Sequence, residues 1–284
     1  MPSDCHIHMV LDGENWKSAI ARHREKPDEH QIRKVLAEYQ ERGVTYLRDG
    51  GDAWGVCSFA AQLAPEYGIR YRTPCFPIHK NGHYGGFIGR GFDTMGEYRA
   101  RIAEARERGA HFIKIMISGL MDFDRLGVLT DTPLTAAEIY DMVSAAHDVG
   151  FAVMAHANGD ETVAAAIRAG VDSIEHGAYL KERTLMLLAQ SEIVWVPTLV
   201  TIGNLIGDGR FPDGVLKPLL AGAMENVAKA AAFGAKIAPG SDAGAYRVPH
   251  GQGTEDEYAL LRRALGAQAD EILERGIAAI QEKF

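Results

Sequence analysis

The sequence predicts a single α/β domain over residues 1–284, folded as a (β/α)8 TIM barrel. Short β-rich runs alternate with amphipathic helical stretches, which is typical of a parallel sheet with crossover helices. Several helical stretches end in a glycine followed by an apolar run, the usual joint between a helix and the next strand. The chain length also fits one closed barrel of about 250 residues. A doubly wound open sheet is the alternative.

Eight runs are predicted as strands, covering residues 5–10, 45–49, 70–76, 112–117, 152–157, 173–176, 194–199 and 236–238. Apolar residues at helical spacing predict helices over residues 31–41, 95–107, 135–149, 161–169, 182–190, 215–233 and 255–265. Thr135 and Glu138 have the spacing of a capping box at one helix start. Residues 270–284 are expected to form one more helix, packed on the outside of the barrel.

Composition narrows the classes of protein that this chain can belong to. The net charge of −8 argues against a nucleic-acid partner, because counterion release requires a basic face. No apolar run approaches the roughly 18 residues of a membrane span, and the N-terminus does not resemble a signal peptide. The widely spaced Cys5, Cys57 and Cys75 indicate reduced thiols in a cytoplasmic protein. The sequence leaves open whether the chain forms a homo-oligomer.

Metal-binding side chains fall where barrel strands deliver residues to one mouth. His6 and His8 are two apart on the first strand, so both imidazoles can face the interior. His156 and His176 end the fifth and sixth strands, and Asp242 follows the eighth. Catalytic groups of such barrels lie at these C-terminal strand ends. Four imidazoles and a carboxylate suit zinc or a similar divalent ion, so the sequence predicts a metal-dependent hydrolase.

Lys114 is an unusual member of this set, because it lies mid-strand in a segment that is apolar on both sides. An ammonium would be repelled by metal ions, and lysine is rarely buried without a partner. A buried lysine can lose its proton, and the neutral amine can add carbon dioxide to become a carbamate. Such a carbamate would bridge two metals. An unmodified Lys114 would indicate one metal or none.

The set resembles the amidohydrolase superfamily, and its imidazolonepropionase-like and prolidase-like branch most closely. The matching motifs are TYLRDGG (45–51), KIMISG (114–119), AHANG (155–159), SIEHG (173–177), VPTL (196–199) and GSDAG (240–244). The resemblance implies that His6, His8 and Asp242 bind the more buried metal and that His156 and His176 bind the second. It also implies a carboxylated Lys114 as the bridge. Members of this branch usually carry a small β-sandwich, and we expect a barrel-only variant here.

The expected reaction is hydrolysis of an amide-type C–N bond in an N-acyl amino acid, a dipeptide or a cyclic amide. A metal-activated hydroxide would attack the carbonyl carbon, with Asp242 as general base and then acid. Alternatives on the same site are a lactone, ester or phosphoester hydrolase, a deaminase or a decarboxylase. A non-catalytic metal-binding barrel is a further alternative, although such relatives typically lose a ligand.

Loops at the same mouth are expected to set the specificity for a small-molecule substrate. The glycine-rich segment 79–87 contains His83 and Tyr84, which are predicted substrate contacts. Tyr246 and Arg247 follow Asp242 closely and are predicted to bind a substrate carboxylate. Segments 79–87 and 202–218 are candidate lids. For segment 79–87, a plain surface loop is an equally good interpretation.

Overall fold

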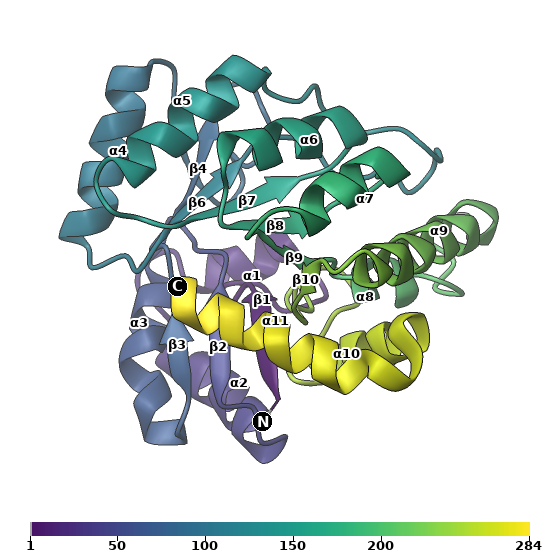
Figure 1. Ribbon diagram of the computed structural model, residues 1–284. Coiled ribbons are helices and arrows are strands. Elements are labelled where there is room, and N and C mark those ends of the chain that lie inside the picture. The colour runs from purple at the N-terminus through teal and green to yellow at the C-terminus, as the bar shows by residue number, and fades with distance from the viewer. Residues whose placement is uncertain (1) are drawn as a thin grey trace.

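A computed structural model describes residues 2–284 of the chain. Its strands are β1 (Ser3–Ile7), β2 (Tyr46–Asp49), β3 (Arg70–Arg72), β4 (Pro77–Lys80), β5 (Arg90–Phe92), β6 (Ile113–Met116), β7 (Val153–Ala157), β8 (Ser173–His176), β9 (Val194–Val196) and β10 (Lys236–Ile237). Its α-helices are α1 (Trp16–Arg22), α2 (Glu29–Glu41), α3 (Val56–Leu63), α4 (Met95–Glu107), α5 (Ala136–His147), α6 (Asp160–Ala169), α7 (Glu182–Ala189), α8 (Val200–Gly203), α9 (Asp213–Ala232), α10 (Gln252–Leu265) and α11 (Ala269–Lys283). Figure 1 shows the helices arranged around the strands.

The strands form a closed ring of parallel strands, which confirms the predicted TIM-barrel class. One sheet has the order β1-β2-β3 and the other β10-β9-β8-β7-β6-β4-β5. The first closure joins β10 to β1, where the Cys5 N–H donates to the Pro239 carbonyl at 2.9 Å. The second closure joins the end of β3 to the start of β6, where the His111 N–H donates to the Thr73 carbonyl at 2.9 Å.

The third barrel strand differs from the prediction of one continuous run over residues 70–76. It is broken into β3, which pairs with β2, and β4, which pairs with β6. Pro74 has no N–H to donate, and Cys75 has a left-handed φ of 63°, so the ladder cannot continue through this point. Because β3 and β4 share one position, the ring has eight positions, and β5 adds to the free edge of β4. Part of the predicted loop 79–87 therefore belongs to β4.

Local turn and cap chemistry explains the joints between helices and strands. The predicted glycine stops all have a positive φ, at Gly43, Gly109, Gly150, Gly170 and Gly234. The capping box of Thr135 and Glu138 is present at the start of α5. The predicted apolar face of α2 is buried against the barrel, consistent with its helical spacing. The helices α1, α3 and α8 are not among the predicted ones, and α1 and α8, with seven and four residues, have too few turns to show apolar periodicity.

The C-terminal helix α11 packs against β10, β9 and β1 and crosses in front of the strands in Figure 1. Side chains of the barrel and of the C-terminal segment form a buried cluster at the N-terminal end of the barrel. The cluster includes Cys5, Phe112, Ile280 and Phe284. The predicted helix at 270–284 is therefore confirmed, but it closes the barrel bottom rather than only covering an outer face. Burial of each large side chain there contributes about 1.5–3 kcal/mol. No helix within residues 2–284 is long and apolar enough to cross a membrane.

Candidate metal centre

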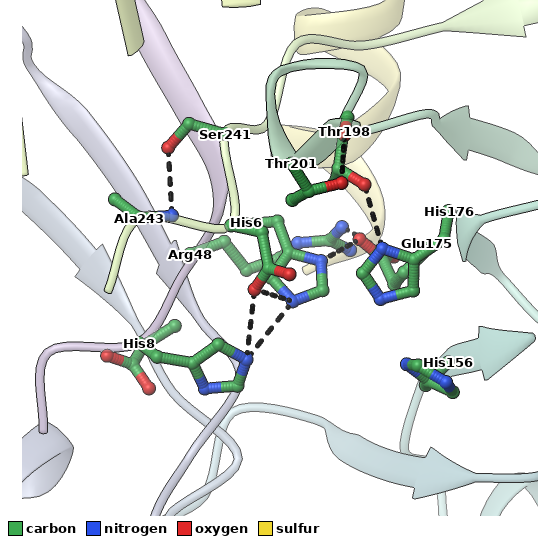
Figure 2. Close-up of polar contacts among 12 residues, drawn as sticks. His6, His8, Arg48, His156, Glu175, His176, Thr198, Thr201, Ser241 and Ala243 are labelled. Carbon is green, nitrogen blue, oxygen red and sulfur yellow. Dashed lines mark hydrogen bonds and ion pairs between the residues drawn. The ribbon is translucent and has the colours of Figure 1, made fainter. Parts of the chain in front are cut away.

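A cavity of about 460 Å³ opens at the C-terminal end of the barrel, where the strands deliver side chains to one mouth. The predicted metal residues all line it: His6, His8, Lys114, His156, His176 and Asp242. The strand positions behind this convergence are those expected, with His6 inside β1, Lys114 inside β6 and His176 at the end of β8. Figure 2 shows the four histidines around one space.

Three of these residues form a compact donor set. His6 Nε2 lies 3.4 Å from His8 Nε2, and the Asp242 Oδ1 atom lies 3.5 Å and 3.3 Å from these two nitrogens. These ligand atoms all lie within 4.8 Å of one another. Burial lowers the pKa of His8 to about 3 and holds the pKa of His6 well below its usual value. Both rings are therefore neutral, and two bare nitrogens and a carboxylate oxygen face one point, which suits a divalent cation.

His156 and His176 lie beside this set but do not share its close spacing. The His176 ring centroid is 5.2 Å from that of His6 and 4.5 Å from that of His156. His176 Nδ1 contacts the Thr198 hydroxyl at 2.7 Å, and His156 Nε2 contacts the Gly119 carbonyl at 3.2 Å. Burial lowers the pKa of His156 to about 3, so this ring is also neutral. The two rings are placed as candidates for a second ion.

Lys114 is fully buried, and its Nζ has no hydrogen-bond partner among the described residues. Burial lowers the pKa of this amine, although the carboxylates of Glu175 and Asp242 act in the opposite direction. A buried ammonium without a partner costs several kcal/mol or more. An orphaned amine facing four histidines fits the carbamate expectation, because a carbamate would give the nitrogen a partner and present anionic oxygens to the site.

The buried ion pair of Glu175 and Arg48 contacts His6 through the Glu175 carboxylate. His6 Nδ1 lies 2.8 Å from Glu175 Oε2, and Glu175 Oε1 accepts from Arg48 Nη2 at 2.9 Å. Arg48 also donates to the Cys5 carbonyl at 2.7 Å and to the Ser173 hydroxyl at 2.9 Å. Figure 2 shows Glu175 and Arg48 behind His6. This role of Glu175 was not predicted, although the residue precedes His176 in the SIEHG motif.

Backbone conformation at the mouth is unusual. His176, Thr198 and Asp242 have left-handed φ angles of 72°, 50° and 59°. Side chains other than glycine rarely adopt this region, and such residues tend to cluster at functional sites. The backbone holds Asp242 in place, because its N–H donates to the His6 carbonyl at 2.7 Å.

The predicted substrate contacts divide into two groups. Tyr84 and Tyr246 line the cavity, and the Tyr84 ring centroid is 4.9 Å from that of His156. His83 does not line it, and its Nδ1 lies 3.1 Å from the Thr132 carbonyl. Arg247 does not line it either, because its guanidinium is paired with Asp208. The structure therefore does not bring His83 or Arg247 to the site.

The comparisons with known proteins agree with this fold. The sequence profile of the amidohydrolase family matches residues 3–280, and the chain belongs to this family. Uncharacterised proteins of Mycobacterium tuberculosis and Mycobacterium bovis are 32% identical over 183 residues. The match covers 61% of this chain and 47% of each relative, so it spans about half the length of these relatives.

Solved structures share the fold over nearly the whole chain. A Xaa-Pro dipeptidase with bound methionine has a TM-score of 0.78 at 23% identity, covering 99% of this chain and 75% of that one. Aspergillus niger ochratoxinase has a TM-score of 0.78 at 21% identity, covering 100% and 71%. A prolidase complexed with N-methylphosphonate-L-proline has a TM-score of 0.75 at 24% identity, covering 100% and 74%. At these identities the likeness shows the fold.

Proposed function

We propose that the chain is a metal-dependent hydrolase that cleaves an amide C–N bond of a small molecule. The observation that carries the proposal is the donor set of His6, His8 and Asp242, whose ligand atoms lie within 4.8 Å of one another in a deep cavity. Membership of the amidohydrolase family supports it, as do fold neighbours named as a dipeptidase, a prolidase and an ochratoxinase.

Zinc is the ion that we propose, because neutral imidazoles and a carboxylate are its usual ligands. His6, His8 and Asp242 would hold one ion, and His156, His176 and carboxylated Lys114 would add a second. An ion in such a site lowers the pKa of water to about 7 and polarises a carbonyl oxygen.

Asp242 moves the protons. Its carboxylate takes a proton from the attacking water and returns it to the leaving nitrogen, so the amine departs neutral. In the metal-free protein, burial raises the pKa of Asp242. Its left-handed backbone and the hydrogen bond from its N–H to the His6 carbonyl fix the position of residue 242 at the mouth.

The test is Asp242→Asn, which keeps the shape of the side chain but removes its basicity. We expect kcat for amide hydrolysis to fall by at least about 10²-fold, with an unchanged circular dichroism spectrum. Asp141→Asn, at an exposed position on α5, is the matched control and should keep full activity. Full activity of the Asp242→Asn variant contradicts the proposed role of this carboxylate.

A further inference from the structure

Two aromatic walls flank the metal residues of the cavity. The first wall contains Trp16, Phe87 and Tyr84. The Trp16 and Phe87 ring centroids are 5.5 Å apart, those of Phe87 and Tyr84 are 5.7 Å apart, and Tyr84 continues to His156 at 4.9 Å. Trp16 is 47% exposed, so this row of rings runs from the rim to a predicted metal ligand. An aromatic group of a substrate can pack against this row of rings while the rest of the substrate reaches the metal residues.

The second wall contains Phe123, Phe211, Tyr246 and a cation, Arg210. The Phe123 and Phe211 centroids are 5.3 Å apart, and the Arg210 guanidinium lies 5.2 Å from the Phe211 centroid and 4.3 Å from that of Tyr246. Stacking on two rings holds a guanidinium flat and directs its N–H donors outward along the edge.

Arg210 has no ion-pair partner in the described part of the chain, although an acid lies close by. Asp208 is taken by Arg247, and it also accepts a hydrogen bond from Tyr246 at 3.1 Å. Apart from buried Lys114, Arg210 is the only lysine or arginine among the residues that line the cavity. An unpaired, oriented guanidinium at the mouth suits a carboxylate, which it can bind with two parallel hydrogen bonds.

Arg210 and the first wall come from distant positions of the barrel ring, although Phe123 of the second wall follows β6, next to β4. Phe87 and Tyr84 follow β4, in the third barrel position, whereas Arg210 and Phe211 follow β9, in the seventh of eight. The two walls also differ in charge. Glu14 lines the cavity near Trp16 and would repel a carboxylate from the first wall. A substrate that spans the cavity would therefore place an apolar group on one wall and an anionic group on the other.

We propose that the cavity selects N-aroyl amino acids, in which an aromatic acyl group stacks on the first wall and the amino-acid carboxylate binds Arg210. This inference rests on the proposed function. Water adds its oxygen to the carbonyl carbon, the C–N bond breaks, and the nitrogen leaves with the proton. The products are an aromatic carboxylic acid and a free amino acid, with no other co-reactant.

The experiment compares three probes on the zinc-loaded protein. N-benzoylalanine has both recognition groups, its carboxamide analogue N-benzoylalaninamide lacks the charge, and N-acetylalanine lacks the ring. We expect kcat/KM for N-benzoylalanine to exceed that of each other probe by about tenfold or more, as the loss of a charge-assisted hydrogen bond or a stacked ring predicts. A fourth compound, N-acetylphenylalanine, carries the ring on the amino-acid side. A higher kcat/KM for it than for N-benzoylalanine would reverse the orientation and overturn the proposal.

Two pairs of variants locate the recognition groups. Arg210→Gln should raise KM for N-benzoylalanine without changing KM for its carboxamide, whereas Arg263→Gln, on the exposed surface of α10, should change neither. Phe87→Ala should remove the preference for benzoyl over acetyl, whereas Tyr140→Ala, at an exposed aromatic residue on α5, should keep it. An unchanged carboxylate preference in Arg210→Gln overturns the proposal.

Failure of the proposed function is distinguishable from failure of this inference. If the zinc-loaded protein hydrolyses none of the probes, the proposed function fails for this class of amide. Calorimetric binding of N-benzoylalanine then decides the inference alone. Tighter binding than that of the carboxamide, lost in Arg210→Gln, supports it, and equal binding of both compounds overturns it.

Discussion

His6 Nδ1 lies 2.8 Å from Glu175 Oε2 at the centre of the barrel, and both side chains are buried. Because a carboxylate only accepts hydrogen bonds, His6 donates its Nδ1 proton and leaves the Nε2 lone pair directed at the site. A carboxylate behind a ligand histidine also increases its basicity towards a metal. The positive charge of Arg48 balances the negative charge of Glu175, so this carboxylate does not depend on a bound ion for its counter-charge.

Glu175→Gln should weaken metal binding by about 10- to 100-fold, because His6 loses the anionic acceptor that fixes its tautomer. Competition with a chromogenic chelator measures this affinity. The single variant also leaves Arg48 unpaired in the core, which should lower the free energy of unfolding by about 3–5 kcal/mol. The double variant Arg48→Met, Glu175→Gln separates the effects, since stability should recover while metal affinity stays low. Wild-type affinity in Glu175→Gln contradicts the positioning role.

Gly50→Ala should disturb the site through His8. A methyl group at position 50 would lie 2.3 Å from His8 Cε1, so the ring must leave its present position beside His6 and Asp242. We expect metal affinity to fall while the barrel stays folded, as measured by metal content after dialysis and by circular dichroism. Gly214→Ala is the matched control, because nothing lies within 4 Å of its added carbon and alanine favours its helix α9. Equal metal content in both variants would show that His8 does not bind metal.

Lys114→Ala should reduce the metal content from two ions to one and make it independent of bicarbonate. The lowered pKa of Lys114 increases the neutral fraction of its amine near pH 7, and only the neutral amine adds carbon dioxide. In the wild-type protein, reloading with zinc should therefore improve with bicarbonate and with rising pH. Lys80→Ala, at a partly exposed lysine paired with Glu138, should respond as the wild type does. Bicarbonate-independent loading of the wild type contradicts carbamate formation.

Glu257→Gln should stabilise the protein increasingly as the pH rises. Burial raises the pKa of Glu257 to about 8, against a usual value of 4.5. Between these values the folded state holds a proton that the unfolded state has lost, so stability falls as the pH rises through this window. Glutamine cannot titrate and keeps the hydrogen bond from the Val200 N–H, which Glu257 accepts at 2.7 Å.

Urea unfolding of the wild-type and Glu257→Gln proteins at pH 5 and pH 8 measures this difference. The free energy of unfolding should differ more at pH 8 than at pH 5. Glu282→Gln, at an exposed position of α11, should show a small and constant difference. A difference that is the same at both pH values for Glu257→Gln would mean that this carboxyl is ionised in the folded protein.

The barrel class and the residues at its mouth could be predicted because both depend on local periodicity. His6 and His8 share a side of β1 by strand alternation, and glycines end helices wherever the φ is positive. Glu175 could not be predicted in the same way. Consecutive residues on a regular strand point to opposite sides, yet Glu175 reaches Arg48 inside the barrel and His176 lines the mouth. The left-handed φ of His176 turns its side chain there.

Contacts between distant segments account for the other differences. Arg247 was predicted to bind a substrate because it lies near Asp242 in sequence. Asp208, 39 residues earlier, instead holds its guanidinium. Arg210, in contrast, was not predicted as a substrate contact but lines the cavity. Nothing in its local sequence indicates that Phe211 and Tyr246 would orient its guanidinium. Loop residues meet partners that no periodic pattern specifies, so their roles emerge only from the folded chain.

Metal removal tests the central claim most directly. The wild-type protein, stripped with a chelator and dialysed, should lose its hydrolysis of N-benzoylalanine, and stoichiometric zinc should restore it in proportion to the metal bound. The same titration on Asp242→Asn should bind zinc more weakly and restore no activity. Hydrolysis at the full rate by a protein that contains no metal would contradict the account.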